Sequence, residues 1–264
     1  MAAMADIAAK TSMFALIHAC VHWLVHKQLA SRTWFAALSS AKRADFVLQI
    51  VWLLLGTPLP FAYGHVALKL SGDIQSRWHG ASIICETAML SHVGQSVYES
   101  VLFAIHRKPL VYQVHHVIVL VSYGLALYCG RMHFWAAWAG CVESTNINLC
   151  VLQMMLISGF GRGGLIETLN GGCLWLLYLA FRVLMLPAWL YGFHHDATHD
   201  YAQTYGFFDD DVSDGLPHRV LHAIVPCSVL GLWLICLLWF QSLTSGMMKA
   251  IRGGSETGKK AKAL

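Results

Sequence analysis

The chain of 264 residues is 57 % hydrophobic and only 12 % charged, and its mean hydropathy is +0.55. This composition excludes an ordinary water-soluble domain and indicates a protein that crosses a membrane several times. The net charge of +4 does not indicate a nucleic-acid partner, because the basic residues flank the apolar segments and form no single patch.

Seven segments are long and apolar enough to be transmembrane helices. In chain order they lie near residues 11–29, 46–69, 82–105, 112–130, 132–158, 169–193 and 219–245. Histidines and glutamates interrupt the first and third segments. Residues 1–9 contain no basic region, so we expect no cleavable signal peptide and a first helix that is retained. The sequence therefore predicts an all-α membrane bundle of about seven transmembrane helices.

The basic residues predict the orientation of these helices. With the N-terminus outside, twelve lysines and arginines fall in inner segments and five in outer segments, which agrees with the positive-inside bias and predicts a cytosolic C-terminus. The inner residues are Lys27, Arg32, Lys42, Arg43, Arg107, Lys108, Arg162, Lys249, Arg252, Lys259, Lys260 and Lys262, and the outer ones are Lys10, Lys69, Arg77, Arg131 and Arg219. Residues 194–218 form the longest outer loop, and their aspartates predict that it is solvated.

The segments predict a single bundle with irregular ends. We expect an N-terminal helix and loop at residues 1–37, the main domain at 38–253 and a disordered basic tail at 254–264. Lys260 and Lys262 resemble the dilysine retrieval signal of endoplasmic reticulum membrane proteins, although a basic solvated tail explains the same residues. The expected location is the endoplasmic reticulum or another endomembrane.

His115 and His116 open the fourth span, and Glu143 lies on the fifth. Ionisable groups inside a membrane are costly and usually serve a function. Imidazole has an ordinary pKa of about 6.5 and suits a base or nucleophile that is neutral in the cytosol. Glu143 is a candidate to orient one imidazole, while Ser144 or Asn146 holds a carbonyl oxygen of a substrate. The alternative is structural, with the histidine pair as an interfacial cap.

Arg182 is the one basic residue in the middle of a predicted span, and it therefore needs a partner inside the bundle. Pro187, five residues later, predicts a kink that frees a backbone carbonyl. Such an opening either widens a path for lipid or is a structural kink, with Arg182 paired to Glu143.

Other histidines suggest a metal-dependent lipid hydroxylase or desaturase. His195 and His199 are spaced i, i+4 beside Asp200, which places two potential ligands on one helical face. The predicted topology puts this group on the outer side and His115 and His116 near the inner side, about a bilayer thickness apart. This separation excludes one shared metal site, so we expect no metal at the histidine pair. A single metal at the outer group is the alternative to solvated loop histidines.

Motifs in several spans resemble, in order, the TRAM/LAG1/CLN8 homology (TLC) domain over about residues 38–253. They are Leu38-Ser39 with Lys42-Arg43, Gly94 with Tyr98-Glu99, His115-His116, Glu143-Ser144-Thr145, Phe181-Arg182 with Leu186-Pro187, and Trp239-Phe240. The resemblance implies an endomembrane protein of lipid metabolism whose helices enclose a hydrophobic tunnel. It also implies substrate-binding roles for Tyr98, Glu99 and Arg182.

The ceramide synthases of this family transfer a fatty acyl group from acyl-CoA to the amine of a sphingoid base. Their motif begins with His-His and carries Asp-x-x-Asp on the next helix. Aligned without a gap from His115-His116, the first Asp falls on Glu143 and the second on Asn146. The resemblance implies an acyl-CoA-dependent N-acyltransferase that uses His115, His116 and Glu143, with acyl-CoA as co-substrate and no bound cofactor.

The lost second carboxylate favours the alternative of a non-catalytic regulator or transporter of membrane lipids. In either case the expected partners are membrane lipids. A homo-oligomer is left open by the sequence.

Overall fold

The computed structural model describes residues 2–199 and 218–261, and the side chains of residues 4–198 and 223–249. The described residues are helical, without a strand, which confirms the predicted all-α bundle. In chain order the helices are α1 (Ala2–Leu29), α2 (Thr33–Ala36), α3 (Ser40–Val51), η1 (Trp52–Gly56), α4 (Pro58–Leu70), α5 (Ile74–His79), α6 (Ile83–Ile105), α7 (Leu110–Cys129), α8 (His133–Gly140), η2 (Cys141–Glu143), α9 (Ser144–Ser158), α10 (Leu165–Tyr178), η3 (Leu179–Leu184), α11 (Met185–His199) and α14 (His218–Ala261).

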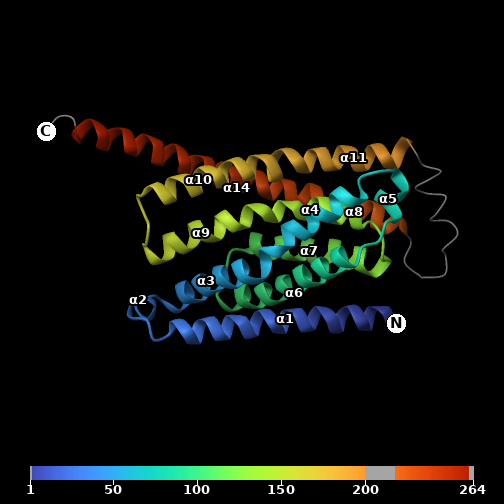
Figure 1. Ribbon diagram of the computed structural model, residues 1–264, viewed down its shortest axis with the longest axis horizontal. Coiled ribbons are helices and arrows are strands. Elements are labelled where there is room, and N and C mark those ends of the chain that lie inside the picture. The colour runs from blue at the N-terminus through green and yellow to red at the C-terminus, as the bar shows by residue number, and fades with distance from the viewer. Residues whose placement is uncertain (1, 200–217, 262–264) are drawn as a thin grey trace.

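These helices form seven rods that run side by side along the long axis (Figure 1). Four rods are the single helices α1, α6, α7 and α14, and three are composite: α3–η1–α4, α8–η2–α9 and α10–η3–α11. Within the described residues, six rods are long and apolar enough to cross a membrane, and α6 is the exception. Its hydropathy is lowered by polar side chains such as His92, Gln95 and Glu99.

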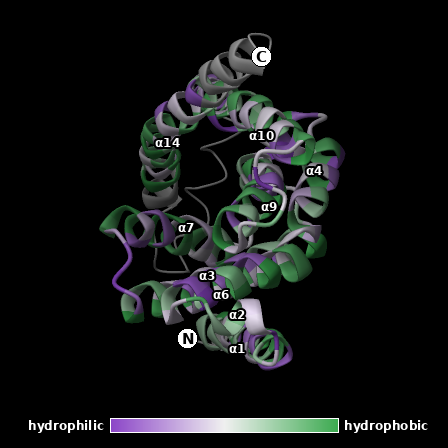
Figure 2. Ribbon diagram, turned by 90° about the vertical axis from the view of Figure 1, so that its left-hand side faces the viewer, coloured by the Kyte–Doolittle hydropathy of each residue, from purple (hydrophilic) through white to green (hydrophobic). Residues whose placement is uncertain are grey.

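Six of the rods form a ring, which Figure 2 shows in a view along the bundle. Around the ring, α6 packs on α7, α7 on α14, α14 on η3 and α11, α10 on α9, α9 on α3, and α4 on α6. The seventh rod, α1, lies outside the ring against α6 and α3. The contact between α1 and α6 is close because Gly94 has no side chain, and a Cβ there would lie 2.6 Å from the Cβ of Phe14.

Each composite rod is interrupted near its middle. The interruptions are π-helical turns at η1 and η3 and a 3-10 turn at η2. Irregular backbone at membrane depth is tolerated where protein buries it, and π turns often occur at functional sites. Two of the turns carry buried charged residues, Glu143 in η2 and Arg182 in η3.

Ion pairs connect the loops at each end of the bundle. At one end, the Lys108 Nζ lies 2.6 Å from the Asp45 Oδ2 and joins the α6–α7 turn to α3. At the other end, Arg77 donates to both carboxylate oxygens of Asp196, at 2.7 and 3.0 Å, and Trp78 Nε1 donates to the same group at 3.3 Å. Lys108 and Arg77, which the sequence assigns to opposite sides of the membrane, thus lie at opposite ends of the bundle.

The prediction that Asp196 belongs to a solvated loop is wrong. The residue lies in α11, which continues to His199, and it is buried because Arg77 and Trp78 satisfy its carboxylate. The aspartates from Asp200 onward in the predicted acidic loop lie outside the described residues. At the end of the chain, α14 continues to Ala261, so the backbone is helical through most of the segment where the composition predicts an irregular tail.

Candidate functional site

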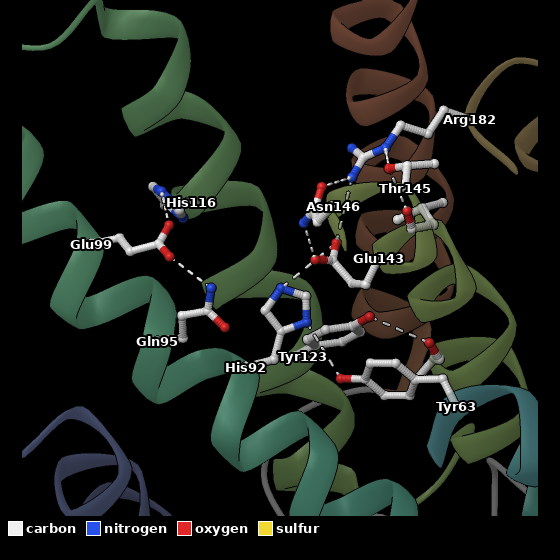
Figure 3. A network of polar contacts seen from close by, with 12 residues as sticks. Tyr63, His92, Gln95, Glu99, His116, Tyr123, Glu143, Thr145, Asn146 and Arg182 are labelled. Atoms are coloured by element: carbon white, nitrogen blue, oxygen red, sulfur yellow. Dashed lines mark hydrogen bonds and ion pairs between the residues drawn. The ribbon is translucent and has the colours of Figure 1, made fainter. Parts of the chain in front are cut away.

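A buried polar network occupies the interior of the ring (Figure 3). Its larger part, which we name the Glu143 cluster, takes side chains from α4, α6, η2, α9 and η3. The members of this cluster are Tyr63, His92, Glu143, Thr145, Asn146 and Arg182.

Arg182 is almost fully engaged within the Glu143 cluster. Its Nε donates to the Oγ1 of Thr145 at 2.8 Å, and its Nη2 donates to the Oδ1 of Asn146 at 2.8 Å. The same Nη2 lies 3.9 Å from the Oε1 of Glu143, whose other oxygen accepts from the Asn146 Nδ2 at 2.6 Å. The guanidinium and the carboxylate are 3 % and 4 % exposed, so their opposite charges compensate each other in a dry environment.

The imidazole nearest to Glu143 is that of His92. Its Nε2 lies 4.0 Å from the Oε1 of Glu143, and its Nδ1 is hydrogen-bonded to the Tyr63 hydroxyl at 3.4 Å. The Tyr123 ring packs beside it, with ring centroids 5.2 Å apart. Reasoning from the sequence missed His92. A usable signal was present, because His92, Gln95 and Glu99 are spaced i, i+3, i+7 and therefore share one face of α6.

The second part of the network is the Glu99–His116 pair, between α6 and α7. The His116 Nε2 lies 3.3 Å from the Oε2 of Glu99, whose other oxygen accepts from the Gln95 Nε2 at 2.7 Å. All three side chains are buried. Figure 3 shows the two parts next to each other, with His92 of the Glu143 cluster and Gln95 of the second part on the same helix, α6.

Several polar atoms around the Glu99–His116 pair have no hydrogen-bond partner among the described residues. They are the Nδ1 of His116, the Nδ1 of His115 and the Oε1 of Gln95. Buried polar atoms in proteins are nearly always bonded to protein, water or ligand. These three atoms are therefore available to bond a polar group, whereas the short hydrogen bonds of Arg182 and Asn146 are made within the Glu143 cluster.

Of the three residues predicted to be catalytic, the structure keeps the His115 and His116 rings adjacent, with centroids 5.4 Å apart, but it does not place Glu143 beside them. It pairs His116 with Glu99 and Glu143 with His92. His115 is half-buried, and its ring packs against Trp239 with centroids 5.8 Å apart.

The predicted substrate-binding residues are also divided. Glu99, Asn146 and Arg182 lie in the ring interior. The Tyr98 hydroxyl instead bonds His22 of α1, on the opposite side of α6, and the Ser144 Oγ donates to the carbonyl of Cys141 in its own rod at 2.8 Å.

The described residues contain no group of three or more His, Cys, Asp or Glu side chains that could hold a metal ion. Of the predicted outer metal group, Asp200 lies outside the described residues. The neighbouring Asp196 is already bonded by Arg77.

The family model of the TLC domain matches residues 71–245, which is more than half of the chain and contains every member of the polar network except Tyr63. No curated protein and no solved structure matches the chain.

Proposed function

The chain belongs to the TLC domain family of membrane proteins of lipid metabolism, and on this premise we propose that it binds a lipid acyl chain inside the ring and transfers an acyl group from acyl-CoA to a lipid amine. In this proposal His116 is the general base and Glu99 orients it. Acyl-CoA is a co-substrate, and no resident cofactor takes part.

The observation that carries the proposal is the state of the two ring nitrogens of His116. The Nε2 faces the Glu99 carboxylate at 3.3 Å, while the buried Nδ1 has no partner among the described residues. A carboxylate on one nitrogen and a free second nitrogen is the arrangement of a base that takes a proton from a nucleophile. Glu99 thus takes the orienting role that the sequence suggested for Glu143.

The reaction is an ordinary aminolysis of a thioester. The His116 Nδ1 accepts a proton as the amine nitrogen attacks the carbonyl carbon, the carbon–sulfur bond breaks, and the departing thiolate takes up that proton. Charge develops on the carbonyl oxygen during the attack. The Nη1 of Arg182, whose contact is the long one of 3.8 Å to the Cys236 Sγ, is the donor of this cluster that is left to stabilise that charge.

The test uses purified protein in lipid nanodiscs, with a long-chain fatty acyl-CoA and a panel of lipid amines. We expect an amide product detected by mass spectrometry. His116→Ala should lower its rate about 100-fold or more, the usual loss when a general base is removed. Glu99→Gln should lower the rate less, because the imidazole keeps a hydrogen-bond partner. His65→Ala is the matched control, since it removes an exposed imidazole from α4. An unchanged rate in His116→Ala would overturn the assignment.

A second candidate function is a non-catalytic protein that binds lipids and adjusts membrane composition. It is favoured by Asn146, which stands in the position of the second carboxylate and bonds both Glu143 and Arg182. In this second candidate function the polar network binds the polar group of a lipid and catalyses no reaction. Lipid that co-purifies with the wild type but not with His116→Ala, together with no amide product, would favour this candidate.

We further propose that the protein lies in the endoplasmic reticulum membrane with its C-terminus in the cytosol. The proposal is supported by the distribution of twelve inner and five outer basic residues and by the lysines of the tail. A glycosylation-acceptor sequence added after Leu264 should stay unmodified, whereas one placed before Met1 should be glycosylated. The reverse result would overturn this orientation.

A further inference from the structure

Pro187 leaves one backbone carbonyl of its rod without the usual helical partner. In an α-helix the N–H of residue 187 would bond the carbonyl of Val183, but proline has no N–H. The carbonyl of Val183 instead accepts a hydrogen bond from the indole Nε1 of Trp233, on α14, at 3.1 Å. A polar backbone group without a hydrogen-bond partner is very costly inside a membrane. The hydrogen bond from Trp233 therefore offsets much of the cost of having Pro187 in this rod.

Helix α14 contacts the η3 turn at two adjacent points. Trp233 lies on one turn of α14 and bonds the carbonyl of Val183. Cys236, three residues later on the same face, has its Sγ 3.8 Å from the Nη1 of Arg182. Both contacts fall on the π-helical turn Leu179–Leu184. Neighbouring residues of α14 therefore hold the backbone of this turn and the guanidinium that it carries.

The direction of Arg182 depends on the shape of this turn. A π turn contains one residue more than the α-helical turn it replaces, and successive residues of a helix differ in direction by about 100°. If the turn relaxed to α-helical geometry, Arg182 would rotate away from Thr145 and Asn146, to which it now donates at 2.8 Å. The hydrogen bond to the Val183 carbonyl therefore affects the direction in which the Arg182 side chain points.

We propose that Trp233 is a positioning residue: its indole N–H substitutes for the N–H that Pro187 lacks, and in this way it keeps the η3 turn in the shape that directs Arg182 into the ring. The activity readout of this inference rests on the proposed function. The stability readout does not.

The test is a cycle of two substitutions, measured as acyl transfer and as thermal unfolding of the protein in nanodiscs. Trp233→Phe keeps the aromatic ring and removes the donor, and it should lower both the rate, by about five-fold, and the unfolding temperature, as expected for the loss of one hydrogen bond. Pro187→Ala restores a backbone donor to the Val183 carbonyl. The double variant should therefore recover the wild-type unfolding temperature, because the Val183 carbonyl again has a hydrogen-bond partner.

Trp175→Phe is the matched control. The Trp175 Nε1 also joins α10 to α14, by donating to the Thr244 Oγ1 at 3.0 Å, but this hydrogen bond involves no residue of the η3 turn. Its removal should leave the transfer rate near that of the wild type, and Pro187→Ala should not restore any stability that it loses.

The inference is overturned if Trp233→Phe changes neither the transfer rate nor the unfolding temperature. It is also overturned if Pro187→Ala fails to restore the unfolding temperature in the double variant. If Trp233→Phe alone does not fold, recovery of a folded double variant supports the inference and its absence overturns it. If the wild type transfers no acyl group, the proposed function fails, and the stability cycle still decides whether Trp233 replaces the missing N–H.

Discussion

Replacing Arg182 by methionine should strongly destabilise the bundle, because it leaves the carboxylate of Glu143 buried without its cation. The Arg182 side chain is 4 % exposed and that of Glu143 is 5 % exposed. Truncating one partner of such a buried pair costs about 3–5 kcal/mol of unfolding free energy. Much of this cost comes from the uncompensated charge that remains.

A second substitution separates the charge effect from the loss of hydrogen bonds. In the double variant Arg182→Met/Glu143→Gln no buried charge remains unpaired. The two short hydrogen bonds to Thr145 and Asn146 are lost, together with the long contact to the Cys236 Sγ. Two such bonds contribute about 1–3 kcal/mol in total. The double variant should therefore be more stable than Arg182→Met alone by about 2 kcal/mol.

The assay is reversible unfolding in mixed detergent micelles, followed by circular dichroism. Lys108→Met is the control, because the Lys108–Asp45 pair has side chains 26 % and 27 % exposed and should contribute less than about 1 kcal/mol. If the double variant were as unstable as the sum of the two single variants, the compensation of charge between Glu143 and Arg182 would be refuted.

Three further predictions concern other parts of the bundle. Gly140→Ala should lower the unfolding free energy by about 1–3 kcal/mol in the same assay, because its Cβ would lie 2.4 Å from the fully buried Tyr63 ring. The control Gly124→Ala, whose Cβ meets no atom within 4 Å, should not destabilise the protein. Equal effects of the two substitutions would contradict the packing argument. Asp196→Asn should lower the unfolding free energy by about 2 kcal/mol, since it removes the ion pair with Arg77 at the end of α11. The unfolding free energy of the variant should also depend less on salt concentration than that of the wild type, because salt screens this ion pair. The Asp73 carboxylate caps α5 and accepts a backbone hydrogen bond from Ser76 that lowers its pKa below the ordinary value of 3.8. The cap therefore stabilises the protein at neutral pH, and this stabilisation is lost as the pH falls through the lowered pKa. The unfolding free energies of Asp73→Ala and the wild type should converge at that low pH, and a difference that stays constant with pH would contradict the cap.

The position of each rod along the chain could be predicted from the sequence, whereas most of the hydrogen bonds and ion pairs inside the ring could not. Apolar runs gave the position of every rod, because spanning a bilayer requires a fixed length of apolar chain. The need of Arg182 for an internal partner also followed from its place in the middle of a span. The apolar segment predicted near residues 82–105 corresponds to α6, although histidines and glutamates interrupt it and α6 fails the hydropathy criterion.

The partners inside the ring depend on how each rod is rotated about its own axis. The turns η2 and η3 change that rotation in mid-rod, and hydropathy contains no signal for them. For this reason the sequence suggested Glu143 as the partner of the histidine pair, while the structure places Glu99 beside His116 and His92 beside Glu143. Asp196 was missed for a related reason, since its burial depends on Arg77, which is distant in the sequence.

The low hydropathy of α6 affects how the nascent chain enters the bilayer. An acidic residue within a single helix raises the free energy of insertion through the translocon by roughly 2.5–3.5 kcal/mol, and Glu99 has His116 and Gln95 as its polar partners among the described residues to offset it. His116 is supplied by α7, the next helix to be synthesised. The two helices are therefore expected to integrate together as a hairpin, so that biogenesis depends on the short turn at residues 106–109 and on α7 following α6 without delay.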